Sequence, residues 1–164
     1  METNGEKLLE IKNLAIEYKT DTELVKAVNG VNLTLYPNEA LGIVGETGAG
    51  KTTTCRGIIG LVQTPPGRVV EGEIFFQGEN LLKKSEREMR KIRGKDITMV
   101  FQDPMTSLNP SMTVGDQIME VIRLHDKISK FNAVIHAKEM LELVGIPSDR
   151  YNEYPHQFSG GMKQ

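Results

Sequence analysis

Eight consecutive residues carry the strongest chemical signal in the sequence. They run from Gly45 to Thr52 and fit the pattern G-x-x-x-x-G-K-[ST], which is typical of a phosphate-binding P-loop. Glycines let a backbone wrap closely round phosphate oxygens, so that successive N–H groups can point inward at them. Lys51 can bring a positive charge to the phosphates, and the Thr52 hydroxyl can ligate Mg²⁺. The predicted contact residues are Gly45, Glu46, Thr47, Gly48, Ala49, Gly50, Lys51, Thr52 and Thr53.

The residues on either side of this loop predict the elements that must position it. Leu41, Ile43 and Val44 form a short apolar run that predicts a strand before the loop. Residues 53–62 predict a helix after it, which would add unpaired N–H groups and a partial positive charge at the phosphate site. A glycine-rich turn that precedes a lysine by chance is the alternative, and these flanks argue against it.

Alternating apolar residues predict antiparallel strands before the loop. Residues 9–11 and 14–18 alternate with polar residues, and the change of phase between them indicates a bulge or break. Residues 31–35 alternate cleanly and predict a half-buried strand. The first of these strands would place Tyr18 near a nucleotide whose phosphates bind to the P-loop. Three more elements are predicted after the loop: a strand at residues 73–76, a charged helix at 86–93 and a strand at 96–101 that ends at Gln102. Ser85 and Glu88 have the spacing of a capping box at the start of the charged helix.

From residue 103 the sequence becomes helical. Thr113 and Asp116 form a capping box, and apolar residues at helical spacing follow it. A second predicted helix ends at Gly145. We therefore expect residues 1–102 to form a β subdomain with the N-terminal part of an α/β core, and residues 103–164 to form a helical subdomain. The apolar side of the second helix is predicted to consist of Phe131, Val134, Ile135, Leu141 and Val144.

The composition indicates a soluble globular protein of the cytoplasm. Hydrophobic residues make up 38% and charged residues 26%, and no apolar run approaches the roughly 20 residues that cross a bilayer. The first seven residues do not form a secretory signal. A net charge of −2 offers no general basic field, so nucleic acid is not expected as a partner. The single cysteine, Cys55, is predicted to be a small packing residue of a helix.

A second glycine pair lies near the C-terminal end of the sequence. Ser159, Gly160 and Gly161 could open a helix whose N–H groups face an anion. Taken alone, this triplet is more often a plain turn or a helix cap, because such residues are common in turns.

In combination, however, these motifs resemble the ATP-binding subunits of ABC transporters. Gln102 matches the family's Q-loop, and residues 159–161 match its signature motif. The stretch at 100–110, VFQDPMTSLNP, resembles the branch that serves oligopeptides, dipeptides and nickel, as do the residues at 65–68 and 154–156. The resemblance covers residues 8–164.

The resemblance implies a role for each site residue. Tyr18 would stack on adenine, Lys51 would hold phosphate as a catalytic residue, and Thr52 would hold Mg²⁺. Gln102, the second catalytic residue, would sense the metal and the attacking water. On the residues alone, strand-face packing of Tyr18 and a strand-end cap at Gln102 remain alternatives.

The resemblance also implies partners. Two such subunits sandwich two ATP molecules head to tail, so that Ser159, Gly160 and Gly161 would cap the γ-phosphate bound to the partner. The helical insert would contact a membrane-spanning permease, and an extracytoplasmic solute-binding protein would take part indirectly. Met162 stands where many relatives carry glutamine, but this branch often has methionine there, so we do not expect the change to inactivate the site.

The Walker B aspartate, catalytic glutamate and switch histidine of the family are not found in the sequence. We therefore expect an N-terminal portion of a longer protein, inactive alone in ATP hydrolysis because nothing positions the nucleophile, and poorly stable because sheet edges are exposed.

The predicted fold is thus a truncated α/β P-loop NTPase of the ABC nucleotide-binding type. The predicted function of the whole protein is ATP hydrolysis that powers import of peptides or a related small solute, at the cytoplasmic face of the membrane. The alternatives are a P-loop kinase or GTPase with a soluble substrate, and an ABC-type ATPase of chromosome or repair machinery. Neither explains the sequence as well, because the first leaves Gln102 and the signature unexplained and the second would want a long coiled-coil insertion. The transported solute stays open.

Overall fold

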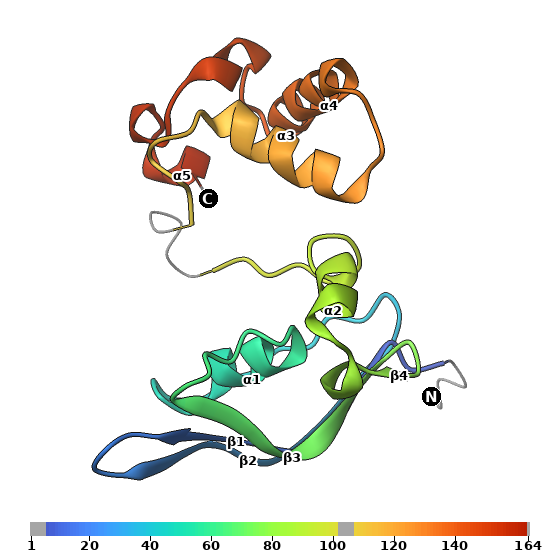
Figure 1. Ribbon diagram of the computed structural model, residues 1–164, viewed down its shortest axis with the longest axis vertical. Coiled ribbons are helices and arrows are strands. Elements are labelled where there is room, and N and C mark those ends of the chain that lie inside the picture. The colour runs from blue at the N-terminus through green and yellow to red at the C-terminus, as the bar shows by residue number, and fades with distance from the viewer. Residues whose placement is uncertain (1–5, 102–106, 164) are drawn as a thin grey trace. The chain divides into compact units, whose positions relative to one another are not determined.

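The computed structural model describes residues 6–101 and 107–163, and the chain divides after Arg90 into two compact units. The first unit is built on an antiparallel sheet, and the second is helical (Figure 1). Within the described ranges, no helix has the length and apolar character that crossing a membrane requires.

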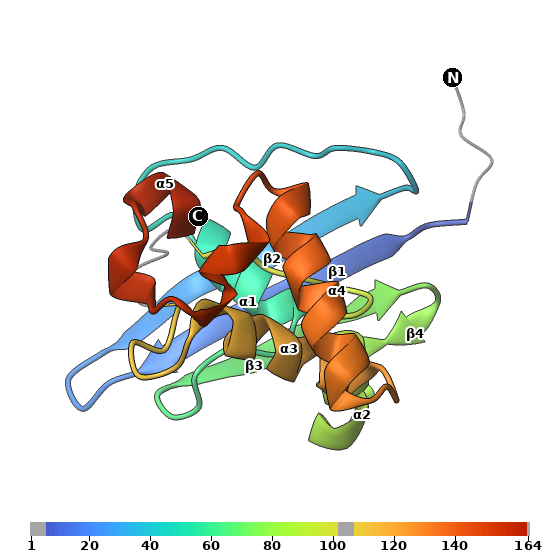
Figure 2. The ribbon, with the colours of Figure 1, turned by 90° about the horizontal axis from the view of Figure 1, so that it is seen from above.

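The sheet has four strands in the order β2-β1-β3-β4, and every neighbouring pair is antiparallel. The three long strands run side by side (Figure 2). The predicted antiparallel pairing of the first two segments is confirmed. Their bounds are β1 Leu9–Lys19, β2 Leu24–Leu35, β3 Gly67–Phe76 and β4 Glu79–Asn80.

The predicted irregularity in β1 lies at Asn13. The register with β2 shifts between Ile11 and Leu14, and Asn13 has a φ of 47°. Its backbone N–H donates to the Oδ1 atom of Asn32 at 2.9 Å instead of to a ladder carbonyl. The bulge keeps apolar side chains on the same face before and after the phase change, because it adds one residue to the alternation.

That face carries the core of the first unit. Ile11, Leu14, Ile16 and Ile74 are at most 1% exposed, and burial of each such side chain stabilises the fold by about 1.5–3 kcal/mol. Helix α1, Lys51–Ile58, packs on this face: a Cβ added to Gly57 would lie 2.9 Å from the Cδ1 atom of Ile16. The helix exists where it was predicted, but begins two residues earlier and ends four residues earlier.

Two predicted strands are wrong. Residues 40–46 have no regular secondary structure, and Val44 is 94% exposed. In the segment 96–101, only Ile97 forms an isolated bridge, and Val100 is 80% exposed. A strand forms only where a neighbour accepts its backbone hydrogen bonds. Among the described residues no strand pairs with either segment, so their apolar pattern alone does not produce one.

A short helical stretch links the sheet to the second unit. The predicted capping box at its start is confirmed, because the backbone N–H of Ser85 donates to the Glu88 carboxylate at 2.8 Å. The elements are η1 Leu81–Lys83, a 3₁₀ turn, and helix α2 Glu86–Ile92.

Two longer helices of the second unit pack against each other and against a 3₁₀ turn. The predicted N-cap of the first is confirmed: the Thr113 hydroxyl accepts the N–H of Asp116 at 3.1 Å. The second ends as predicted at Gly145, whose φ of 78° glycine adopts without strain. The helices and turns are α3 Val114–His125, α4 Lys130–Leu143, η2 Ser148–Asn152, η3 Pro155–Gln157 and α5 Gly160–Lys163.

The predicted apolar side of α4 is only partly the buried side. Leu141 is buried and Val134 packs against the core, whereas Phe131 and Val144 are 74% and 70% exposed. On the buried side of α4 lie two small residues, Ala133 and Ala137, which let the neighbouring elements approach closely. The core of this unit consists of Val114, Ala137, Leu141, Ile146, Tyr151 and Phe158.

Candidate functional site

The predicted P-loop forms a turn whose backbone favours glycine at two positions. Gly48 and Gly50 have φ angles of 85° and 83°, in the left-handed region. Gly50 is also tight against β2, because an added Cβ would lie well inside 3.0 Å of the carbonyl oxygen of Ala27. At Gly48 an added Cβ would meet nothing within 4 Å. The loop is therefore braced on the sheet at Gly50 and open to solvent at Gly48.

The start of α1 presents backbone donors to this open side. Gly50 provides no side-chain cap, and the first helical hydrogen bond runs from the N–H of Thr54 to the carbonyl of Gly50 at 2.8 Å. Within residues 6–101 and 107–163, no acceptor bonds to the backbone N–H groups of Lys51, Thr52 or Thr53. Unpaired N–H groups at the positive end of a helix dipole attract an anion.

The two side chains with predicted ligand roles stand on this first turn. The Lys51 ammonium lies over the loop, donating to the carbonyl oxygens of Gly45 at 2.5 Å and Glu46 at 2.6 Å. Thr52 is exposed, and no partner for its hydroxyl lies within hydrogen-bond distance among the described residues. No cluster of acidic, histidine or cysteine side chains in the described part of the chain could hold a metal by itself. A metal that binds jointly to phosphate and to one hydroxyl fits this donor set, since Mg²⁺ is usually bound through substrate phosphates and few protein ligands.

Tyr18 lies on the sheet, close to the point where Gly50 of the loop contacts β2. It pairs with Val25 of β2, two residues from the Ala27 carbonyl that Gly50 abuts. Its half-buried ring packs on the start of β3, where a Cβ added to Gly67 would be 2.7 Å from the Cε1 atom. β2 thus brings Tyr18 and the loop to neighbouring positions of one unit.

The remaining predicted residues belong to the second unit of the chain. Ser159, Gly160 and Gly161 are exposed residues of the second unit, at the start of α5. The Ser159 hydroxyl accepts the N–H of Met162 at 3.4 Å, as a helix cap does. Gln102 lies outside the described residues.

Sequence reasoning missed two residues that support these motifs. Ala27 gives no motif signal, although its backbone carbonyl bounds the loop at Gly50. Arg150 binds groups on both sides of the Ser159–Gly161 triplet. Its spacing to Glu153, three residues on, could have suggested a local ion pair, but nothing in the sequence pattern indicates the contact with Met162.

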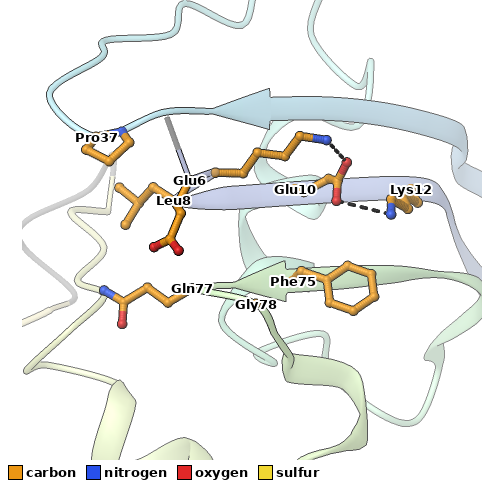
Figure 3. Close-up of a pocket in the computed structure, with 9 residues that line it drawn as sticks. Glu6, Leu8, Glu10, Lys12, Pro37, Phe75, Gln77 and Gly78 are labelled. Atoms are coloured by element: carbon orange, nitrogen blue, oxygen red, sulfur yellow. Dashed lines mark hydrogen bonds and ion pairs between the residues drawn. The ribbon is translucent and has the colours of Figure 1, made fainter. Parts of the chain in front are cut away.

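Two cavities lie in the first unit. One, of about 430 Å³, is lined by Lys51, Thr54 and the exposed residues 41–44. The other, of about 630 Å³, is at the opposite end of β1 from Tyr18 and holds none of the predicted site residues (Figure 3). There the Glu10 carboxylate binds Lys7 and Lys12, and these hydrogen bonds lower the pKa of Glu10. Because Lys7, Glu10 and Lys12 form ion pairs with one another along its lining, we interpret this cavity as a feature of the sheet surface.

Comparison with known proteins relates most of the chain to one family. Residues 28–164 match the family described as ABC transporter. The chain is 54% identical over 160 residues to the oligopeptide transport ATP-binding protein OppD of Bacillus subtilis (strain 168), covering 96% of the chain and 45% of OppD. It is 48% identical over 161 residues to the dipeptide transport ATP-binding protein DppD of the same strain, covering 97% of the chain and 48% of DppD.

Solved structures give the same result for the fold. The ATP-binding cassette MJ0796 in a dimeric post-hydrolysis state, bound to ADP and Pi, matches with a TM-score of 0.79 at 25% identity, over 94% of this chain and 65% of that one. A second dimeric structure of MJ0796, described as a bacterial ABC transporter cassette, matches with the same TM-score at 27% identity and the same coverage. The chain spans about half the length of the curated relatives it matches.

Proposed function

The chain belongs to the ABC transporter family, and from this premise we propose that it is the ATP-binding portion of a subunit whose ATP hydrolysis powers peptide import. The names of two similar relatives, an oligopeptide and a dipeptide transport ATP-binding protein, support a peptide as the imported solute. The proposed site of action is the cytoplasmic face of the membrane, beside a membrane-spanning permease, with a solute-binding protein delivering the peptide.

One observation supports this proposal above the others: the loop before α1 and the first turn of that helix present several hydrogen-bond donors that suit a phosphate chain. Its unpaired N–H groups, the Lys51 ammonium and the exposed Thr52 hydroxyl all lie within the first turn of one helix. The backbone N–H donors are fixed by the fold before the anion binds, so the main rearrangement on binding is that of the Lys51 side chain.

Each proposed site residue acts through a chemical group that suits its role. The Lys51 ammonium would leave the carbonyls of Gly45 and Glu46 for phosphate oxygens, which carry more negative charge. The Tyr18 ring would offer a stacking surface for adenine. Mg²⁺, held by Thr52 and Gln102, would neutralise part of the phosphate charge. Gln102 would also orient the attacking water.

The signature triplet is proposed to act on a second subunit. The MJ0796 cassettes are dimeric in both solved structures, which supports a dimer here. Ser159, Gly160 and Gly161 would then bind the γ-phosphate of the ATP held by the partner's P-loop. Hydrolysis would thus depend on both subunits closing together.

Peptide uptake tests the proposal in the full natural protein. Cells that lack the gene are complemented with wild type, with Lys51→Met, or with Lys95→Met, which removes an exposed lysine distant in sequence from the loop. We expect uptake of a labelled oligopeptide with wild type and Lys95→Met, and background uptake with Lys51→Met. Uptake at the wild-type rate with Lys51→Met would overturn the proposal.

A further inference from the structure

Arg150 of η2 binds three groups in the segment that leads into and out of the signature triplet. Its Nε and Nη2 atoms lie 2.8 and 2.6 Å from the Glu153 carboxylate. Nη2 also donates to the carbonyl oxygen of Gln157 at 3.0 Å. Nη1 lies 3.2 Å from the Sδ atom of Met162. The side chain therefore joins residues before and after Ser159–Gly161.

The same guanidinium packs on the core of the second unit. Its Cζ atom is 4.6 Å from the centroid of the Phe158 ring, in a cation–π contact, and Phe158 is buried. Glu153 is itself tied to the core, because its carbonyl oxygen accepts the N–H of Val114 at 2.9 Å. Arg150 thus connects the triplet's flanks to the start of α3.

Among the described residues, the bonds that Ser159 accepts from the N–H groups of Met162 and Lys163 are the triplet's own hydrogen bonds, and its glycines have no side chain that could pack. Ser159, Gly160 and Gly161 are exposed, and an added Cβ on either glycine would meet nothing within 4 Å. Two glycines in succession carry a large conformational entropy in the free state, which opposes order. Their conformation must therefore be set by the residues on either side, which Arg150 holds.

From these contacts we infer that Arg150 is a positioning residue, which holds Ser159, Gly160 and Gly161 ready for the phosphate bound by the partner subunit. The inference rests on the proposed function. Lysine could not replace arginine in this role, because an ammonium on a flexible stem cannot bind a carboxylate, a carbonyl and a sulfur in one plane.

The test compares Arg150→Lys and Arg150→Met with wild type in the full natural chain. Arg123→Lys serves as the control, because Arg123 is an exposed arginine of α3 in the same unit. Two equilibria are measured for each protein: ATP binding by the isolated subunit, and ATP-dependent association of subunits by sedimentation velocity. Hydrogen exchange then reports local order in residues 153–163 against α3 and α4.

For both Arg150 variants we expect ATP binding within about two-fold of wild type, because the P-loop belongs to the other unit. Association should weaken by about ten-fold or more, as loss of charge-assisted hydrogen bonds predicts. Amide exchange should accelerate in residues 157–163 while α3 and α4 stay protected.

Three results would overturn the inference. One is association of both Arg150 variants at the level of Arg123→Lys. Another is exchange that accelerates equally throughout α3 and α4, which would make Arg150 a general stability residue. If wild type itself fails to bind ATP or to associate with it, the proposed function fails, and this inference fails with it. That last result is distinguishable because it appears before any variant is compared.

Discussion

Gly50 lies directly against the carbonyl oxygen of Ala27, so the phosphate-binding loop is braced on the second strand of the sheet. A side chain does not fit there, and Gly50 also has a left-handed φ of 83°, which disfavours residues other than glycine. The same strand pairs with Tyr18 through Val25. β2 is therefore the element that sets the loop and the proposed adenine platform side by side.

Because the loop contacts β2 at Gly50 but has open space at Gly48, we expect alanine at these two positions to destabilise the protein by different amounts. Gly48→Ala introduces only left-handed strain, which costs about 1–2 kcal/mol. Gly50→Ala has the same strain and also collides with the backbone of β2, which adds about 1–3 kcal/mol. Urea unfolding of both variants measures the difference. Equal losses of stability would show that the loop does not rest on Ala27.

Tyr151 predicts how the stability of the second unit depends on pH. Burial, followed by the nearby Asp116 carboxylate, raises the pKa of Tyr151 above its ordinary value of 10.0. The folded state therefore favours the protonated phenol. Its contribution is fully present below pH 10 and is lost as the pH rises through the raised folded-state pKa.

Tyr151→Phe isolates this contribution, because the variant keeps the ring but loses the hydroxyl that donates to Asp116 at 3.2 Å. At pH 7 we expect the variant to be less stable by about 1 kcal/mol. Above pH 10 the wild type should lose this advantage, because only the wild type must keep its phenol protonated. Urea midpoints measured from pH 8 to 11 check both statements. A constant difference across that range would contradict the linkage.

The exposed apolar residues before the loop predict self-association of the 164-residue chain. Val44 is almost wholly exposed beside Leu41 and Ile43, and such patches favour association. Val44→Ser should reduce concentration-dependent association in light scattering. Val70→Ser, at a partly exposed valine of β3, should not. Equal association of the two variants would rule out this patch as the cause.

Local patterns predicted much of the fold correctly. The phase change in β1 located the irregularity at Asn13, and the caps at Ser85 and Thr113 form as their spacing indicated. These features depend on residues within a few positions of one another, so the sequence contains the whole cause.

The failures depend on partners that are distant in sequence. The apolar runs at residues 41–44 and 96–101 suggested strands, but a strand also needs a neighbour, and none pairs with them among the described residues. Phe131 follows the helical spacing of α4 yet stays exposed, because the packing direction is set by Ala133 and Ala137. The position of the signature relative to the P-loop stays a prediction.

The most direct test of the account is the affinity of the full natural chain for ATP, measured by titration calorimetry. We predict that wild type and Lys95→Met bind ATP equally, and that Lys51→Met binds about ten-fold or more weakly, because it loses the ammonium beside the phosphates. Absence of ATP binding by the folded wild type, or equal affinity for Lys51→Met, would contradict the assignment of residues 45–53 as the nucleotide site.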